Sequence, residues 1–458
     1  MKVNLAGYNI DSSLIDNILS KSATPETISA AYARISRSSD SADVLRKKAL
    51  LDVHKARASN TNIAFDMGHS SISEHAVFNF DIIGVSRLLA ESIQKTRLAS
   101  FTEKSQRYVT VGRDYVVPKE LEGTPLKKKF ESLVKQQSRL YYKLFELGKE
   151  NLEQNSGLKS KRDIAIKSKE DARYFLPLAS TTQMGMTINA RSLCRLLVRL
   201  HKSDFAEAKE LFFLLEKPAK KVAPSLVKRT TSTSFGQKLQ HSHIDTKPLK
   251  WGVKIVDKSS NIDDLILTTL FFEKGFTCSE AKKRIRLLAK DKKERFFEEF
   301  FKNLTTFDVM PRAFEFAFFT FEIVCSATCF AQLKRHRMFT ILNSNYVPQN
   351  GFITPPLVKK LKMDREISQI IDNTKNLYSE LENFKRGLGS YILTNSNMVS
   401  VLVRTNLRHL YHFSRLRADE HAQWEIQNIA KKVDELVKSQ APLSARYLGG
   451  KSKFEGLF

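Results

Sequence analysis

Two clusters of basic and polar side chains have the residue types needed to bind an anionic group. Residues 335–337, Arg-His-Arg, follow a strongly apolar segment, 313–333. Guanidinium groups bind phosphate in bidentate fashion and keep their charge. The second cluster is the loop 100–108, which offers backbone N–H groups, hydroxyls and one arginine. Each cluster alone is typical of a solvated surface, but the position of the first at the end of an apolar helix favours phosphate or nucleotide binding.

The same order of elements surrounds each cluster. Alternating apolar residues in 76–82 and in 316–324 predict two strands. Each strand leads into an apolar helix, then a basic cluster at 95–97 or 335–337, then a polar loop. This pattern indicates a large-period duplication rather than a solenoid repeat. A second paired element follows each loop, at 186–193 and at 402–410.

The duplication predicts two modules. The first spans 1–228 and the second spans 251–458. Between them, residues 229–250 are rich in Lys, Ser and Thr and have no clear apolar periodicity. Such a composition predicts a linker.

The first half resembles the flavin-dependent thymidylate synthases. Gly68–Phe78 is similar to the stretch that precedes the signature of that family. The signature is Arg-His-Arg, seven residues, then Ser, usually continued as Gln-Arg-Tyr. Its downstream part is present at 105–108, Ser-Gln-Arg-Tyr, with Glu103 before it. Its upstream part is replaced by Lys-Thr-Arg at 95–97, so the first half has only the downstream part.

The second half shows the reverse pattern. The upstream part of the signature is present as Arg-His-Arg at 335–337, preceded by Gln332. In the downstream part, Asn345 stands at the Ser position and Val347 at the Arg position. The two halves therefore resemble complementary parts of one signature.

The later motifs of the family divide in the same way. Its Ala-Arg-x-x-Leu-Pro element is present at 172–177, whereas Ser390 stands at the Arg position of the second half. Its Leu-Arg pair, followed by a His-Ala-Gln-Trp-Glu-Ile helix, is nearly intact at 416–426, whereas 200–205 has diverged. The Asn-Ala-Arg element survives in both halves, as 189–191 and 406–408.

The resemblance implies an α/β (α+β) fold in which each half packs an antiparallel sheet against helices. It implies the reductive methylation of deoxyuridylate to thymidylate, with methylenetetrahydrofolate as carbon donor, FAD as hydride carrier and NADPH as the usual reductant. The protein then supplies orientation and charge to the chemistry of the cofactor. By resemblance, Arg417 and Arg335 contact the uracil, where a cation can stabilise charge that develops on the ring.

The resemblance assigns the other site residues to three ligands. The sugar and phosphate of the nucleotide are assigned to Glu103, Ser105, Gln106, Arg107 and Arg173, with Gln332 as a further substrate contact. FAD is assigned to Ser71, Glu74, Arg335, His336, Arg337, Asn406, Arg408, His412 and His421. The folate is assigned to His69. We expect no metal site, because His421 and Glu425 have no third ligand at a matching spacing.

The losses in the two halves also predict an assembly. In the family, the deoxyuridylate site lies between subunits: one offers the Ser loop and the Arg of the Ala-Arg element, and its neighbour offers the Gln, the Arg-His-Arg and the Leu-Arg arginine. Random decay of two copies would not leave one complementary set. We therefore expect an active enzyme, and we expect two chains to form a homodimer equivalent to the four-subunit enzyme of the family.

Charge and composition leave two alternatives open. The formal net charge is +26, which attracts polyanions in general, so nucleic acid is a possible partner. One alternative is action on another pyrimidine nucleotide, and the other is a non-enzymatic nucleic-acid-binding protein on a decayed scaffold. The apolar segment 313–333 contains Glu315 and Glu322, which argues against a membrane span. The chain has only four cysteines and no apolar leader, which favours a reducing, cytoplasmic location.

Overall fold

The computed structural model describes residues 1–17, 19–112, 114–234 and 248–452, and the chain divides into two compact units. Unit 1 comprises Met1–Ala172, Leu176–Asp245 and Leu361–Ile392. Unit 2 comprises Arg173–Phe175, Thr246–Lys360 and Leu393–Phe458. Each unit thus includes a segment from the opposite half of the sequence. Most of the linker expected at 229–250, namely 235–247, lies outside the described residues.

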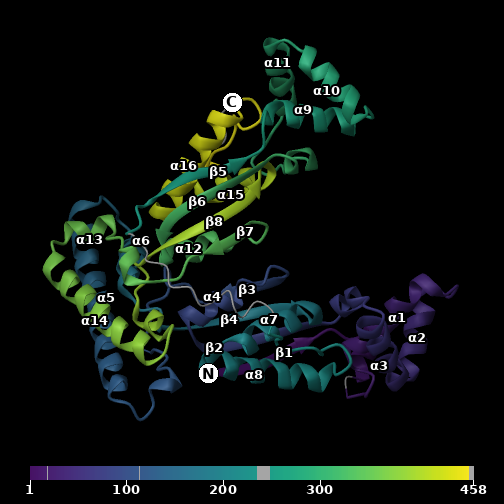
Figure 1. The fold of residues 1–458 in the computed structure, drawn as a ribbon, viewed down its shortest axis with the longest axis horizontal. Coiled ribbons are helices and arrows are strands. Elements are labelled where there is room, and N and C mark those ends of the chain that lie inside the picture. Colours follow the sequence, from purple (N-terminus) through teal and green to yellow (C-terminus); the bar gives the residue numbers. More distant parts are fainter. Residues whose placement is uncertain (18, 113, 235–247, 453–458) are drawn as a thin grey trace. The chain divides into compact units, whose positions relative to one another are not determined.

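Unit 1 is built on a four-stranded antiparallel sheet with the order β1-β2-β4-β3 (Figure 1). The strands are β1 (Lys2–Tyr8), β2 (Val77–Ser86), β3 (Ala99–Glu103) and β4 (Thr181–Asn189). Phe80 of β2 lies opposite Met186 of β4, and both are buried. Their side chains join a core with α4 (Arg87–Ile93), α7 (Ala190–Lys202) and α8 (Ala206–Val222). The alternate burial along β2 has the period of two expected of a half-covered strand.

Two groups of helices complete unit 1. The first contains α1 (Pro25–Arg34), α2 (Ala42–Leu51), α3 (Val53–Thr61) and the short helix η4 (Ser70–His75). The second contains α5 (Pro125–Asn155), α6 (Lys161–Ala172), α14 (Asp364–Phe384) and the short helix η10 (Leu388–Ile392). Leu381 and Leu388 share a buried core with Phe130 and Leu133 of α5. This apolar contact explains why 361–392 belongs to unit 1.

Unit 2 repeats the sheet of unit 1, with the antiparallel order β5-β6-β8-β7. Its strands are β5 (Gly252–Lys258), β6 (Phe318–Ser326), β7 (Thr340–Asn343) and β8 (Met398–Asn406). α12 (Ala327–Leu333) follows β6 and α15 (Leu407–Arg417) follows β8, and α16 (Trp424–Gln440) comes after α15. The remaining helices described in unit 2 are α9 (Ile262–Glu273), α10 (Cys278–Leu287), α11 (Lys290–Phe301), α13 (Pro356–Lys360), η6 (Arg173–Phe175), η8 (Arg312–Glu315) and η9 (Pro348–Asn350).

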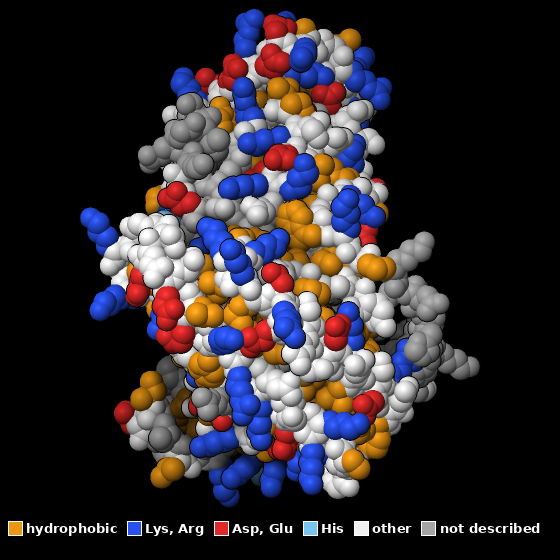
Figure 2. All heavy atoms as spheres, turned by 90° about the vertical axis from the view of Figure 1, so that its left-hand side faces the viewer, with side chains coloured by type: hydrophobic (Ala, Val, Ile, Leu, Met, Phe, Trp, Pro, Cys, Tyr) orange, Lys and Arg blue, Asp and Glu red, His pale blue; other side chains and the backbone are white. Residues whose placement is uncertain are grey.

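The predicted fold class is confirmed, since each unit packs an antiparallel sheet with helices and the strand order is the same in both. The apolar segment 313–333 forms β6 followed by α12, as its pattern predicted. Among the described residues, no helix combines the length and the apolarity needed to cross a membrane. Figure 2 shows Lys and Arg side chains spread over one face of the molecule and interspersed with Asp and Glu.

Candidate active site

His336 and Arg417 of unit 2 meet near the ends of α12 and α15. Arg417 Nε donates a hydrogen bond of 3.0 Å to His336 Nε2. The imidazole is buried against Phe339 and Phe413, whose ring centroids lie 5.3 and 4.9 Å from its own. Burial, and after it the charge of Arg417, lowers the pKa of His336 to about 3. His336 is therefore neutral at pH 7 and orients the Arg417 guanidinium by accepting its N–H.

Arg417 and Arg335 form a partly buried pair of like charges. The pKa of Arg417 is lowered, first by burial and also by the positive charge of Arg335. Arg335 itself is half-buried, whereas Arg337 is exposed. Two guanidinium groups held out of water in this way attract an anionic or electron-rich group. The resemblance assigns both arginines to the uracil, and Arg335 is close enough to lower the pKa of Arg417.

A network of hydrogen bonds supports Gln332. Its Nε2 donates to Gln423 Oε1 over 3.3 Å, and this oxygen also caps α16 by accepting the backbone N–H groups of Glu425 and Ile426. Gln423 Nε2 donates to Tyr174 OH over 2.8 Å, and Tyr174 OH donates to the Glu425 carboxylate over 2.6 Å. Gln423, Tyr174 and Glu425 are fully buried. We call these three residues the Gln–Tyr–Glu network.

Arg173 belongs to unit 2 although it lies in the first half of the sequence. Its carbonyl oxygen accepts a hydrogen bond of 3.0 Å from Asn395 Nδ2. The adjacent Tyr174 ring stacks on Trp424, with centroids 5.9 Å apart. Backbone and side-chain contacts therefore hold this short segment in the same unit as the Arg-His-Arg cluster, and the Arg173 side chain is buried there.

A cavity of about 440 Å³ opens beside α15 in unit 2. Its wall carries one acid, Asp308, and five basic or imidazole side chains: Arg408, His409, His412, Arg415 and Lys451. Arg408 forms an ion pair with Glu315 and donates to the Met310 carbonyl over 2.7 Å. Burial is the largest of the effects that lower the pKa of His412. The positive wall suits an anionic ligand.

The cavity contains only some of the residues assigned to flavin. Arg408 and His412 line it, whereas Arg337 and His421 are exposed and lie off its wall. Asn406 has a structural role, because it caps α15 by accepting from the backbone N–H of His409 over 3.0 Å. His336 likewise contacts Arg417 rather than the cavity.

In unit 1, the acidic and basic side chains of the Ser loop are held by neighbours. Gln94 Nε2 donates to Glu103 Oε2 over 2.7 Å, and Thr182 Oγ1 donates to Glu103 Oε1 over 3.1 Å. Arg107 Nε lies 2.5 Å from a carboxylate oxygen of Glu170, which is fully buried. This ion pair fixes the direction of the Arg107 guanidinium.

The loop itself is shaped by Ser105. Its Oγ accepts the backbone N–H of Arg107 over 3.2 Å, a local contact typical of a serine turn. Ser105, Gln106 and Arg107 are half-buried, and Tyr108 beside them is exposed. The loop therefore presents polar groups at the surface of unit 1 from a fixed backbone.

The segment with His69, Ser71 and Glu74 is also in unit 1, on and before η4. His69 and Ser71 are exposed, and Glu74 forms an ion pair with Arg191 of the Asn-Ala-Arg element. Ser29 of α1 donates its hydroxyl to the carbonyl oxygen of residue 72 over 2.7 Å, which fixes η4 against α1.

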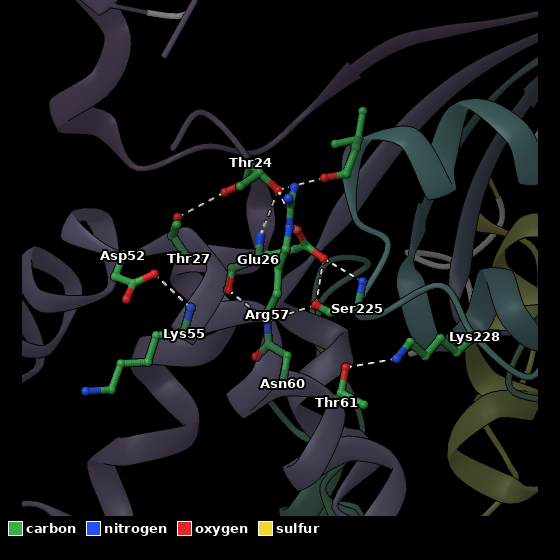
Figure 3. Close-up of polar contacts among 11 residues, drawn as sticks. Thr24, Glu26, Thr27, Asp52, Lys55, Arg57, Asn60, Thr61, Ser225 and Lys228 are labelled. Atoms are coloured by element: carbon green, nitrogen blue, oxygen red, sulfur yellow. Dashed lines mark hydrogen bonds and ion pairs between the residues drawn. The ribbon is translucent and has the colours of Figure 1, made fainter. Parts of the chain in front are cut away.

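The position of α1 is set by a buried carboxylate, shown in Figure 3. Glu26 accepts from the backbone N–H and the hydroxyl of Ser225 over 2.7 and 2.6 Å, and pairs with Arg57 Nε over 2.5 Å. Asn60 Nδ2 donates to the Glu26 carbonyl over 2.9 Å. Four hydrogen-bonded groups thus join α1, α3 and the segment after α8, and so position η4 indirectly.

Sequence reasoning gave no role to Gln423 or Tyr174. Both lie inside motifs that the sequence displays, directly beside Trp424 and Arg173. Their contact joins residues from opposite halves of the sequence, so no spacing along the chain could have indicated it. The signal that was present is a polar residue at a helix N-terminus, since Gln423 caps α16.

Comparison with known proteins finds similarity over both halves of the chain. The profile of the family described as thymidylate synthase complementing protein matches residues 17–225 and 268–443. The UPF0159 protein Ta1429 of Thermoplasma acidophilum is 23% identical over 433 residues, 83% of this chain and 86% of that protein. A flavin-dependent thymidylate synthase of Clostridium tetani is 30% identical over 218 residues, 46% of this chain and 84% of the relative. A solved structure of a UMP/dUMP methylase from Streptomyces cacaoi, bound with 5-Br dUMP, is 20% identical with a TM-score of 0.34, covering 50% of this chain and 93% of its own.

Proposed function

The chain belongs to the thymidylate synthase complementing protein family, that of the flavin-dependent thymidylate synthases, and on this premise we propose that it converts dUMP to dTMP. The reaction we propose is an FAD-dependent reductive methylation. Methylenetetrahydrofolate supplies the carbon and NADPH supplies the reducing equivalents.

The observation that carries the proposal is the arrangement of Arg417, His336 and Arg335. A neutral imidazole accepts the Arg417 Nε–H, so the guanidinium keeps one orientation. Arg335 adds a second cation nearby. Because its orientation is fixed before substrate arrives, such a pair can stabilise negative charge that develops on a uracil ring without rearranging.

Each unit carries a different part of the proposed nucleotide-binding set. Unit 2 contains Gln332 and Arg173, and unit 1 contains Glu103, Ser105 and Arg107. We propose that both sets serve one nucleotide, because neither unit has the complete set. We also propose a homodimer as the active form, by analogy with symmetric assembly in general. A dimer with about two flavins and two nucleotides would be its expected composition.

The basic cavity of unit 2 fits an anionic cofactor such as FAD. Arg408 and His412 would hold it there, and Lys451 would add positive charge that suits an anionic group. When bound, FAD supplies hydride transfer. The contribution of the protein is to orient the cofactor and to keep Arg408 in place through Glu315. Ser71, Glu74 and His69 of unit 1 are the remaining residues we propose for cofactor and folate.

The proposal is tested by anaerobic turnover of labelled dUMP with purified full-length chain, FAD, methylenetetrahydrofolate and NADPH. We expect a yellow protein with a flavin absorbance band, and labelled dTMP as product. A flavoprotein that methylates a different pyrimidine nucleotide but leaves dUMP unchanged would support the first alternative. A protein that neither binds FAD nor turns over, but shifts nucleic acid in a salt-dependent way, would support the second.

A further inference from the structure

Two buried carboxylates occupy equivalent positions in the two units. In unit 1, Glu207 accepts the backbone N–H and the hydroxyl of Ser86 over 2.7 and 2.8 Å, and the hydroxyl of Tyr391 over 2.7 Å. In unit 2, Glu425 accepts the same pair of groups from Ser326 and the hydroxyl of Tyr174. The serines cap α4 and α12. The shared contacts join a strand end, a helix start and a tyrosine, so they serve the fold in both units.

The units differ in the residue that stands two positions before each glutamate. In unit 2 this residue is Gln423, which connects Tyr174 to Gln332 by hydrogen bonds. In unit 1 it is Phe205, whose ring meets Tyr391 edge-on at 6.0 Å. Only unit 2 therefore extends the Tyr–Glu contact to a residue of the proposed nucleotide site.

The donors around Gln423 determine how Gln332 is oriented. Two backbone N–H groups of α16 point at one side-chain atom of Gln423, which must therefore be its oxygen. The amide nitrogen then faces Tyr174 OH, and that hydroxyl donates to Glu425. Because Gln423 offers its oxygen, Gln332 must offer its Nε2. The Gln332 Oε1 therefore points away from Gln423, where it can accept a hydrogen bond from another group.

We propose that Tyr174 and Gln423 are positioning residues, which fix the Gln332 carboxamide so that its oxygen accepts a hydrogen bond from a donor group of the nucleotide. The inference rests on the proposed function. The donor is a ring N–H or a sugar hydroxyl, since dUMP offers both. Without the Gln–Tyr–Glu network, the Gln332 carboxamide could rotate so that its NH₂ group faces the donor of the nucleotide. Two hydrogen-bond donors would then face and repel each other.

The test compares two matched substitutions in the full chain, Tyr174→Phe and Tyr391→Phe, with dUMP binding measured by calorimetry. Each removes one hydroxyl from a buried glutamate, so both should lower the melting temperature. Tyr174→Phe should do so at least as much, because Gln423 Nε2 also loses its acceptor. Only Tyr174→Phe should raise the Kd for dUMP, by about tenfold, as expected for one lost hydrogen bond. Gln423→Phe introduces the residue that unit 1 has at this position, Phe205. It should also raise the Kd for dUMP, while Tyr174 itself stays unchanged.

Coupling makes the test specific. In a Gln332→Ala background, Tyr174→Phe should cause no further loss of dUMP affinity. The loss of affinity caused by Tyr174→Phe should also vanish with one of two analogues. N3-methyl-dUMP lacks the ring N–H, and 2′,3′-dideoxyuridine monophosphate lacks the 3′-hydroxyl. The analogue with which the loss vanishes identifies the donor. The inference would be overturned if Tyr174→Phe still lowered the affinity for both analogues. It would also be overturned if the two tyrosine substitutions changed the Kd for dUMP equally. Failure of the native chain to bind dUMP would instead overturn the proposed function.

Discussion

Unit 1 and unit 2 share a strand order and a succession of helices, yet they differ in which polar residues they contain. Contacts that serve the fold occur in both. Asn189 and Asn406 each cap the helix that follows the last strand of their half, β4 or β8, and Glu74–Arg191 is matched by Glu315–Arg408. A residue present in both units is therefore explained first by folding.

The contacts near the basic clusters differ. In unit 2, Arg417 donates to a buried imidazole, whereas in unit 1 Arg199 Nη2 donates over 2.7 Å to Thr96, the residue at the His336 position. Lys95 stands exposed at the Arg335 position. Unit 1 thus retains the packing of this region but lacks the paired arginines of unit 2.

The largest effect is expected for Arg417→Ala. It removes a cation that contacts the uracil in our proposal, at a cost on the order of 3 kcal/mol in transition-state stabilisation. We expect kcat/KM for dUMP to fall more than a hundredfold. Lys95→Ala, at the Arg335 position of unit 1, should change it by less than about twofold. Comparable losses from both substitutions would refute the division between the units.

Stability should fall in both units when the buried glutamates are removed, and at least as much in unit 2, where Glu425 also has a hydrogen bond with the Trp251 side chain. Glu207→Ala and Glu425→Ala each leave a serine N–H, a serine hydroxyl and a tyrosine hydroxyl without an acceptor. We expect each to reduce the free energy of unfolding by about 3 kcal/mol, measured by urea denaturation. A much smaller effect in unit 1 would show that its carboxylate is not needed for folding.

A moderate effect on binding is expected for Arg107→Ala in unit 1. Loss of a phosphate contact should weaken dUMP binding by about 2 kcal/mol, or roughly thirtyfold in Kd, measured by calorimetry. The exposed neighbour Lys104 offers a matched control, and Lys104→Ala should leave Kd within about twofold. Unchanged affinity in Arg107→Ala would remove unit 1 from the nucleotide site.

The smallest effect is a pH dependence of the free energy of unfolding. We expect it from His336 in unit 2 and not from Thr96, which stands at the same position in unit 1. The folded pKa of His336 is about 3, below its ordinary value of 6.5, so between these limits the unfolded chain binds the extra proton. The contribution of His336 to the free energy of unfolding is thus fully present above pH 6.5 and is lost as pH falls towards 3. From pH 7 to 5.5 the loss should be about 1 kcal/mol. His336→Gln should remove that part of the slope in urea titrations, whereas Thr96→Ala should leave the slope intact.

Sequence patterns predicted two of the eight strands that the structure describes, β2 and β6, because alternating apolar residues are a local signal. The alternation in 76–82 and the apolar run 313–333 appear as β2, β6 and α12. The assignment of site residues from the resemblance stays a prediction, but the structure adds roles to some of them. His336 orients Arg417, and Asn406 caps α15, roles that residue type alone could not indicate.

The repeated order of elements along the chain was enough to predict the duplication. The fold class and the unequal division of motifs between the halves were predicted from the resemblance to the family. The segments that complete each unit, 361–392 in unit 1 and Arg173–Phe175 in unit 2, became evident from the three-dimensional contacts. Tyr174 joins Glu425 and Tyr391 joins Glu207, each across the midpoint of the chain. A buried carboxylate is stable only when hydrogen-bond donors surround it, and these donors can come from segments far away in the sequence. Such contacts produce no periodic pattern of residues, so the sequence did not indicate them.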